Sequence, residues 1–279
     1  MKRSLLLFII FLKGSVSYCQ AFNEPVIPAI SSGAYSSQFS NVFSFTANQA
    51  SLASLKNTSV GIYNEKRFLL PGLNEFLAAF GLVTTHGNFG AVIKYAGAAS
   101  YNETSFGFTH ARKMGKALDV GVQINYHRVS IDEYGAASAI GIEIGSLFHL
   151  SNDWCAGIHL ANPVSNRFGI DKKEKLPSVY TMGLGYRASD LVAACMEIIK
   201  EEDQPVQINM SVSYQFLPEL LAKIGLTTAT SSLWAAIDFA RKAYQLELSA
   251  SYHPQLGVSP AMLIIFDFKT FSKKQQSDE

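Results

Sequence analysis

Along most of the chain, hydrophobic and polar residues alternate with a period of two. In residues 206–216, aliphatic and aromatic side chains occupy every second position, and Gln, Asn and Ser fill the positions between them. Such alternation is typical of a β-strand whose two faces meet different environments. The pattern recurs at 118–126, 140–148, 180–186 and 244–252. It predicts an all-β fold.

The alternation predicts about fourteen strands, each roughly nine to twelve residues long. They are expected at 58–67, 76–84, 88–97, 102–111, 117–129, 138–149, 153–161, 178–188, 191–200, 205–216, 220–228, 233–240, 243–252 and 261–268. Tilted strands of this length can cross a bilayer, whereas strands of soluble proteins average about five to six residues. We therefore predict an antiparallel transmembrane β-barrel at 58–268, with a soluble β-sandwich as the alternative.

The predicted connections alternate in length along the chain. Tight turns follow the even-numbered strands, at 86–88, 113–116, 151–153, 189–190, 217–219 and 241–242. Longer links follow most odd-numbered strands, at 68–75, 130–137, 162–177, 201–204 and 253–260. Short periplasmic turns opposite longer outer loops are typical of outer-membrane barrels, and an even strand count leaves both termini in the periplasm. The 162–177 loop is therefore expected at the cell exterior.

Residues 1–19 are predicted to be a signal peptide. A basic start precedes an apolar run at 5–12 that is too short to span a membrane, and Ser17 and Cys19 suit cleavage before Gln20. A lipid anchor on Cys19 is the alternative. The mature chain is therefore expected to be exported.

Residues 20–57 do not alternate like the rest of the chain. Small polar residues fill 31–40, and the apolar residues of 41–55 are spaced as in a helix. A fourteen-stranded barrel has a lumen wider than side chains alone can fill. We predict that 20–57 forms a plug inside the barrel, and that 269–279 is a polar C-terminal tail.

Charged residues on the strands fall mainly on the polar face. A Lys or Arg on the lipid face costs about 2–4 kcal/mol at the bilayer midplane, so these residues should point into the lumen. The predicted luminal set comprises Lys94, Glu143, Arg187, Glu197, Lys223, Asp238 and Glu247. We interpret it as a paired network that stiffens the wall, with a selectivity ring as the alternative. Aromatic residues near strand ends suit the interfacial girdles, namely Tyr63, Tyr101, Tyr126, Phe148, Trp154, Tyr180, Trp234 and Tyr252.

Composition argues against several other functional classes. The chain has 16% charged residues and a net charge of +1 without a basic block, so no nucleic-acid partner is expected. The three cysteines lack metal-ligand spacing, and the six histidines share no motif with a nucleophile or an acid. No catalytic residue, cofactor or metal is therefore predicted, and the chain is not expected to be an enzyme. Cys155 and Cys195 are expected on strands separated by one other, about 9–10 Å apart and beyond disulfide reach.

Several motifs carry a family resemblance. Residues 43–53, with Asn48-Gln49-Ala50, resemble the Asn-Pro-Ala stretch near the start of FadL and OmpP1 outer-membrane barrels. The order of later motifs resembles the PorV and PorQ group of Bacteroidota proteins within the FadL-like superfamily. These motifs lie at 156–163, 176–177, 183–186, 223–226, 236–240 and 256–259. The resemblance implies a fourteen-stranded barrel with a luminal N-terminal segment and a link to type IX secretion or another envelope complex.

These observations predict a protein of the Gram-negative outer membrane, in a bacterium of the Bacteroidota. The main functional hypothesis is an accessory subunit of an outer-membrane secretion or assembly complex, because the lumen is charged and the loops are too short for a substrate vestibule. Its expected partners are outer-membrane lipid, lipopolysaccharide and a larger membrane complex. One alternative is a FadL-like channel that takes up small hydrophobic ligands. The other is a purely structural barrel with a sealed lumen.

Overall fold

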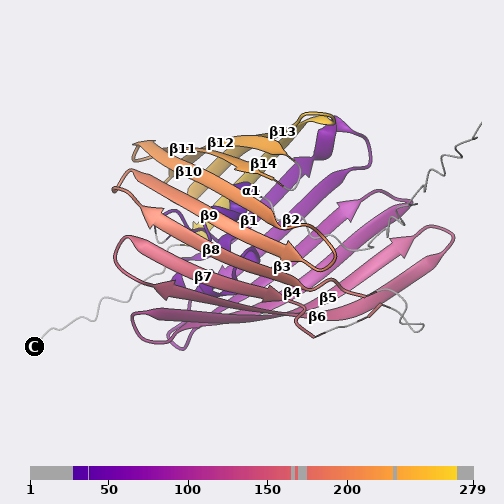
Figure 1. Ribbon diagram of the computed structural model, residues 1–279, viewed down its shortest axis with the longest axis horizontal. Coiled ribbons are helices and arrows are strands. Elements are labelled where there is room, and N and C mark those ends of the chain that lie inside the picture. Colours follow the sequence, from indigo (N-terminus) through magenta and orange to yellow (C-terminus); the bar gives the residue numbers. More distant parts are fainter. Residues whose placement is uncertain (1–27, 37, 165–166, 169–174, 229–230, 269–279) are drawn as a thin grey trace, which may run out of the picture.

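The computed structural model describes residues 28–36, 38–164, 167–168, 175–228 and 231–268. Figure 1 shows them as a barrel of tilted strands with a coiled N-terminal segment inside. The predicted signal peptide at 1–19 and tail at 269–279 lie outside the described residues. In the described part of the chain, no helix is both long enough and apolar enough to cross a membrane.

Fourteen antiparallel strands close the barrel in sequence order, and β1 completes the circle by pairing with β14. The strands are β1 (Thr58–Lys66), β2 (Asn74–Leu82), β3 (Asn88–Gly97), β4 (Tyr101–Lys113), β5 (Leu118–Ile131), β6 (Gly135–His149), β7 (Trp154–Ala161), β8 (Val179–Arg187), β9 (Val192–Glu201), β10 (Gln207–Leu217), β11 (Leu220–Thr227), β12 (Ser232–Arg241), β13 (Tyr244–His253) and β14 (Gly257–Phe268). The predicted fold class is confirmed. We refer to the end where even-numbered strands finish as the turn end and to the opposite end as the loop end.

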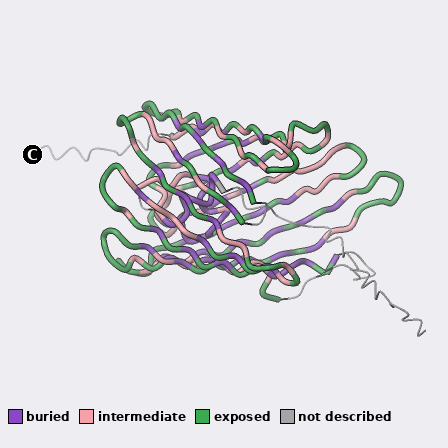
Figure 2. The backbone as a smooth tube through the Cα atoms, turned by 45° about the horizontal axis from the view of Figure 1, so that its top comes forward, coloured by how far each residue is buried: buried purple, intermediate pink, exposed green. Residues whose placement is uncertain are grey.

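The barrel is apolar outside and polar inside. On β12, Leu233 and Ile237 are 60% and 59% exposed, whereas Trp234 and Asp238, which follow them, are buried. Figure 2 shows exposed and buried positions alternating along the strands. Monomeric soluble proteins rarely expose apolar patches larger than a few hundred Å². The continuous apolar outer wall is therefore a lipid-facing surface, which agrees with the lengths of the strands.

Most aromatic residues predicted for the girdles lie on this outer wall. Tyr101, Tyr126, Phe148, Trp154, Tyr180 and Tyr252 are exposed. Tyr63 and Trp234 are only 3% and 4% exposed, so their assignment to the girdles is wrong. Both occupy inward positions of their strands, where Tyr63 donates a hydrogen bond to Glu65 (2.8 Å) and Trp234 packs against Ala29 of the N-terminal segment.

Several predicted loop boundaries differ from the structure, most clearly at two places. Residues 130–137 were expected as a long loop, but β5 and β6 stay paired as far as Ile131 and Gly135. Pro260 was expected to precede the last strand and instead lies within β14. Proline has no backbone N–H to donate to a neighbouring strand. Pro260 is tolerated because the pairing of β14 with β1 starts at Ala261, so no residue of β1 is paired with Pro260.

The connection between β7 and β8 bends inward at the loop end. Phe168 and Leu176 are buried against Val129 and Ala139, which are inward positions of β5 and β6. Lys175 Nζ lies 2.6 Å from Glu202 Oε2, and this hydrogen bond holds the pKa of Glu202 below its ordinary value. The described part of this connection therefore packs into the lumen at the loop end.

The N-terminal segment lies inside the barrel, nearer the turn end (Figure 1). It contains α1 (Pro28–Ser31) and the 3-10 helices η1 (Ser44–Thr46) and η2 (Gln49–Ser54); a further 3-10 turn, η3 (Arg67–Leu69), follows β1. Phe43, Phe45 and Leu52 pack against inward residues of β1–β4 and β14. We call residues 28–36 and 38–57 the plug.

Candidate functional site

The plug packs directly against glycines on the inner wall, and we call each such glycine contact a seat of the plug. Tyr35 lies against β8, where a Cβ atom added at Gly183 would be 2.2 Å from Tyr35 Cζ. A Cβ at Gly185 would be 2.0 Å from the carbonyl oxygen of Tyr35. Both distances are far below van der Waals contact. The plug therefore reaches its position only because these two positions lack a side chain.

A second seat holds the start of η2 against β5 and β6. Added Cβ atoms at Gly121 and Gly145 would be 2.4 Å from Gln49 C and 2.3 Å from Asn48 Oδ1. Asn48 caps η2 by accepting a hydrogen bond from Ala50 N (3.1 Å), and its Nδ2 donates to Ser146 O (3.2 Å). The Asn-Gln-Ala stretch noted in the sequence is therefore a docking element of the plug.

The carboxylate of Glu143 joins the plug to the wall. It accepts hydrogen bonds from Gln49 Nε2 of the plug and from Asn125 Nδ2 of β5 (2.5 Å). His159 Nε2 lies 3.0 Å from Glu143 Oε2, the oxygen that also accepts from Gln49. Ser54 Oγ of the plug makes a further polar tie, donating to Asp119 Oδ2 at 2.9 Å. Two polar side chains of the plug, Gln49 and Ser54, are thus paired with luminal carboxylates.

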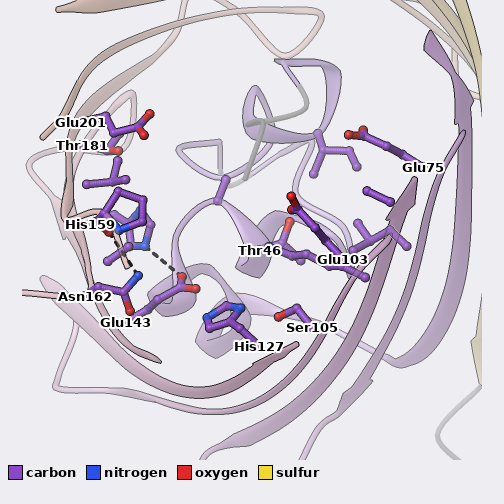
Figure 3. Close-up of a pocket in the computed structure, with 18 of the residues that line it drawn as sticks. Thr46, Glu75, Glu103, Ser105, His127, Glu143, His159, Asn162, Thr181 and Glu201 are labelled. Carbon is purple, nitrogen blue, oxygen red and sulfur yellow. Dashed lines mark hydrogen bonds and ion pairs between the residues drawn. The ribbon is translucent and has the colours of Figure 1, made fainter. Parts of the chain in front are cut away.

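A cavity of about 140 Å³ lies between the plug and the loop end. Figure 3 shows its labelled side chains arranged around an open centre. The plug contributes Ile30, Thr46 and Ala47 as its floor. The apolar part of its wall includes Tyr63, Leu77, Tyr95, Ala96, Ala161, Pro177 and Val179. The polar part includes Glu75, Lys94, Glu103, Ser105, His127, Glu143, His159, Asn162, Thr181, Glu197 and Glu201.

The structure distributes the predicted luminal charges over three places. Lys94, Glu143 and Glu197 line the cavity. On the other side of the barrel, Lys223 Nζ lies 2.6 Å from Glu247 Oε2 and 4.0 Å from Asp238 Oδ2, and all three are buried. Arg187 lies at the turn end, where its Nη2 is 2.9 Å from Asp153 Oδ1. The seven residues are therefore separate groups rather than one network.

Sequence reasoning missed several cavity residues. His127 and His159 are inward on β5 and β7, although isolated histidines carried no motif. The sequence pattern predicts Glu201 in a loop, but it is the last residue of β9 and is buried. Extending each strand's alternation by one residue pair would have placed Glu201 on the luminal face.

The described residues contain two free cysteines and no group of three His, Cys, Asp or Glu residues that could hold a metal ion. Cys155 and Cys195 both pair in register with Gly185, one on each side of β8, as the predicted strand spacing requires. The Tyr35 backbone lies over Gly185 between them.

No family model matches the sequence, and no curated protein matches it. Several solved structures share its fold. The monoaromatic hydrocarbon channel CymD superposes with a TM-score of 0.65 at 10% identity, over 82% of this chain and 93% of that one. The toluene transporter TodX of Pseudomonas putida gives 0.62 at 10% identity, over 88% and 98%. The toluene transporter TbuX of Ralstonia pickettii gives 0.60 at 10% identity, over 83% and 94%.

The main functional prediction from the sequence, an accessory subunit of a secretion complex, is wrong. The three solved structures compared above are channels and transporters for hydrocarbons, and the charged lumen, which the prediction treats as evidence against a channel, contains a cavity. Short outer loops do not exclude a ligand site, because the cavity lies within the barrel and needs no external vestibule.

Proposed function

We propose that this protein is an outer-membrane channel that admits small, largely apolar molecules. The observation that carries the proposal is the cavity above the plug, inside a barrel whose fold is shared with hydrocarbon channels. Its volume of about 140 Å³ is close to that of an engineered protein cavity of about 150 Å³ that binds benzene. A molecule with a single aromatic ring therefore matches its size.

Luminal charge does not oppose this function, because most of it is already paired. Lys223 is held by Glu247 and Asp238 within the wall, and Glu143 is held by the plug and by its neighbours on the strands. Each of these charged groups therefore has a partner of opposite charge or a hydrogen-bond donor without a ligand. The apolar part of the wall, which includes Leu77 and Val179, remains available to contact a substrate.

The plug is the barrier to passage in this conformation. It packs on glycine seats and is tied to Glu143 and Asp119, so a substrate in the cavity cannot reach the turn end while the plug stays seated. Transport then requires a displacement of the plug. The contacts of Tyr35 and Gln49, which hold the plug in position, therefore control passage in this proposal.

Ligand binding by detergent-solubilised protein tests the proposal. Toluene should bind to the wild-type protein in isothermal titration calorimetry. Ala161→Phe places a ring in the cavity and should abolish binding. Ala235→Phe is the matched control because Ala235 faces outward on β12, and it should bind toluene like the wild type. Absence of toluene binding to the wild type, or equal binding by both variants, would contradict the proposal.

The narrower assignments remain predictions. The apolar outer wall and the shared barrel fold support a Gram-negative outer membrane, with lipid and lipopolysaccharide as the surroundings of the wall. The resemblance to PorV and PorQ, and the Bacteroidota source that it implies, rest on sequence motifs alone.

A further inference from the structure

We infer that the cavity selects small amphipathic amines: molecules with one aromatic ring or a short alkyl chain and a protonated amino group, held by the carboxylate of Glu201. This inference rests on the proposed channel function and narrows its substrate class. It comes from carboxylate oxygens in the cavity that lack a partner.

The inference depends chiefly on the buried carboxylate of Glu201. It is the last residue of β9, is only 6% exposed, and lines the cavity with its carboxylate directed inward (Figure 3). Within the described part of the chain, its side chain has no ion pair or hydrogen bond, and its Oε1 atom is fully buried. A buried carboxylate without a partner is costly in its charged form. A cationic N–H donor from a ligand would remove that cost.

A second unpartnered oxygen lies deeper on the same wall. Glu197 is 1% exposed, and its Oε2 accepts hydrogen bonds from Ser31 Oγ (2.7 Å) and Asn209 Nδ2 (3.2 Å). Its Oε1 atom is buried without a partner among the described residues. Glu197 and Glu201 are four residues apart on one strand, about 13 Å along its axis. β9 thus carries an incompletely paired carboxylate at each of two depths in the barrel, and Glu201 is the more accessible of the two.

The cations of the cavity lie elsewhere on its wall. Lys94 lies on β3, far around the barrel from β9, and the ring of His159 is 3.0 Å from Glu143. Five glutamates line the cavity, against one lysine and two histidines. An anionic ligand such as a fatty acid would therefore meet mainly like charge, whereas an ammonium group would meet opposite charge.

The apolar part of the cavity wall fits the uncharged body of such a ligand. Val179 is paired in register with Glu201, and Pro177 lies just before it, so apolar surface adjoins the carboxylate. Leu77 and Tyr95 lie on other strands of the wall. A ligand with a charged end and an apolar body matches both parts of the cavity wall.

The test compares three probes that share a phenyl ring and differ in charge: 2-phenylethylamine, propylbenzene and phenylacetate. Each is titrated into the full-length protein in detergent at pH 7. The amine should bind about ten- to a hundredfold more tightly than propylbenzene, as expected for one charge-assisted hydrogen bond, and phenylacetate should bind least. Glu201→Gln should remove the preference for the amine and leave propylbenzene binding unchanged.

Two further variants keep the test decisive. Glu201→Asp retains the charge and should retain the preference, while Glu133→Gln removes an exposed carboxylate at the loop end and should change nothing. Equal affinity of the wild type for the amine and propylbenzene, or an unchanged preference in Glu201→Gln, would overturn the amine inference and leave the channel proposal intact. Failure of both propylbenzene and the amine to bind the wild type would overturn the channel proposal itself.

Discussion

Replacing Gly183 with Ala should unseat the plug at Tyr35. The new Cβ would be 2.2 Å from Cζ and 2.4 Å from Cε1 and Cε2 of the ring, whereas ordinary contact begins near 3.4 Å. The ring would have to recede by roughly 1 Å, and a Cβ placed at Gly157 would also be only 2.7 Å from its Cε1 atom, so the ring is closely packed there too. Overpacking of this kind costs about 1–3 kcal/mol. A cost of about 2 kcal/mol raises the population of a displaced plug about thirtyfold.

Single-channel recording in planar bilayers measures this population. The wild type should be closed almost all the time, and Gly183→Ala should show openings roughly thirtyfold more often. Adding Tyr35→Ala to Gly183→Ala removes the clash, so the double variant should open no more often than Tyr35→Ala alone. If Gly183→Ala is as closed and as heat-stable as the wild type, Tyr35 does not hold the plug through this seat.

Four further outcomes follow from the same contacts. Deleting residues 28–57 should give a large, steady conductance, and an unchanged closed state would show that the plug is not the barrier. Glu143→Leu leaves the amide donor of Gln49 and its neighbours unpaired, at about 1–3 kcal/mol each, and should raise conductance in the same recordings. Lys223→Met should cost about 3–5 kcal/mol in urea unfolding because two buried carboxylates lose their cation; adding Glu247→Leu should recover much of this. The pKa of Glu202 is lowered by Lys175, so this tie is present above the ordinary glutamate pKa and is lost as pH falls through the lowered value, where protease should cut the β7–β8 connection faster.

The strands could be predicted because lipid and lumen impose opposite demands on alternate residues. β3 was predicted at its observed bounds, since Asn88 and Gly97 both border turns. The extended hairpin of β5 and β6 was missed at its tip, where small residues such as Ala136 and Ala137 carry little alternation. The alternation of apolar and polar residues weakens where a strand leaves the membrane, so strand ends are less predictable than strand centres.

The cavity could not be predicted from the sequence in the same way. Alternation shows that Glu143, Lys223 and Glu247 point inward, but it does not show which of them the plug or the neighbouring strands neutralise. That outcome depends on where Gln49 docks and on which strands lie beside each other in the closed barrel. The sequence therefore predicts correctly that charged residues point into the lumen. The conclusion that this charge argues against a channel is wrong, because pairing within the wall leaves space for a ligand.

The most direct test of the channel proposal is a crystal structure of the wild-type protein soaked with bromobenzene, whose bromine marks its position by anomalous scattering. We expect one strong bromine peak in the cavity, above Ala47 and between the walls that carry Leu77 and Val179. Crystals of Ala161→Phe should lack this peak. Bromine peaks confined to the outer wall, with none in the cavity, would contradict the proposal that the lumen binds small apolar molecules.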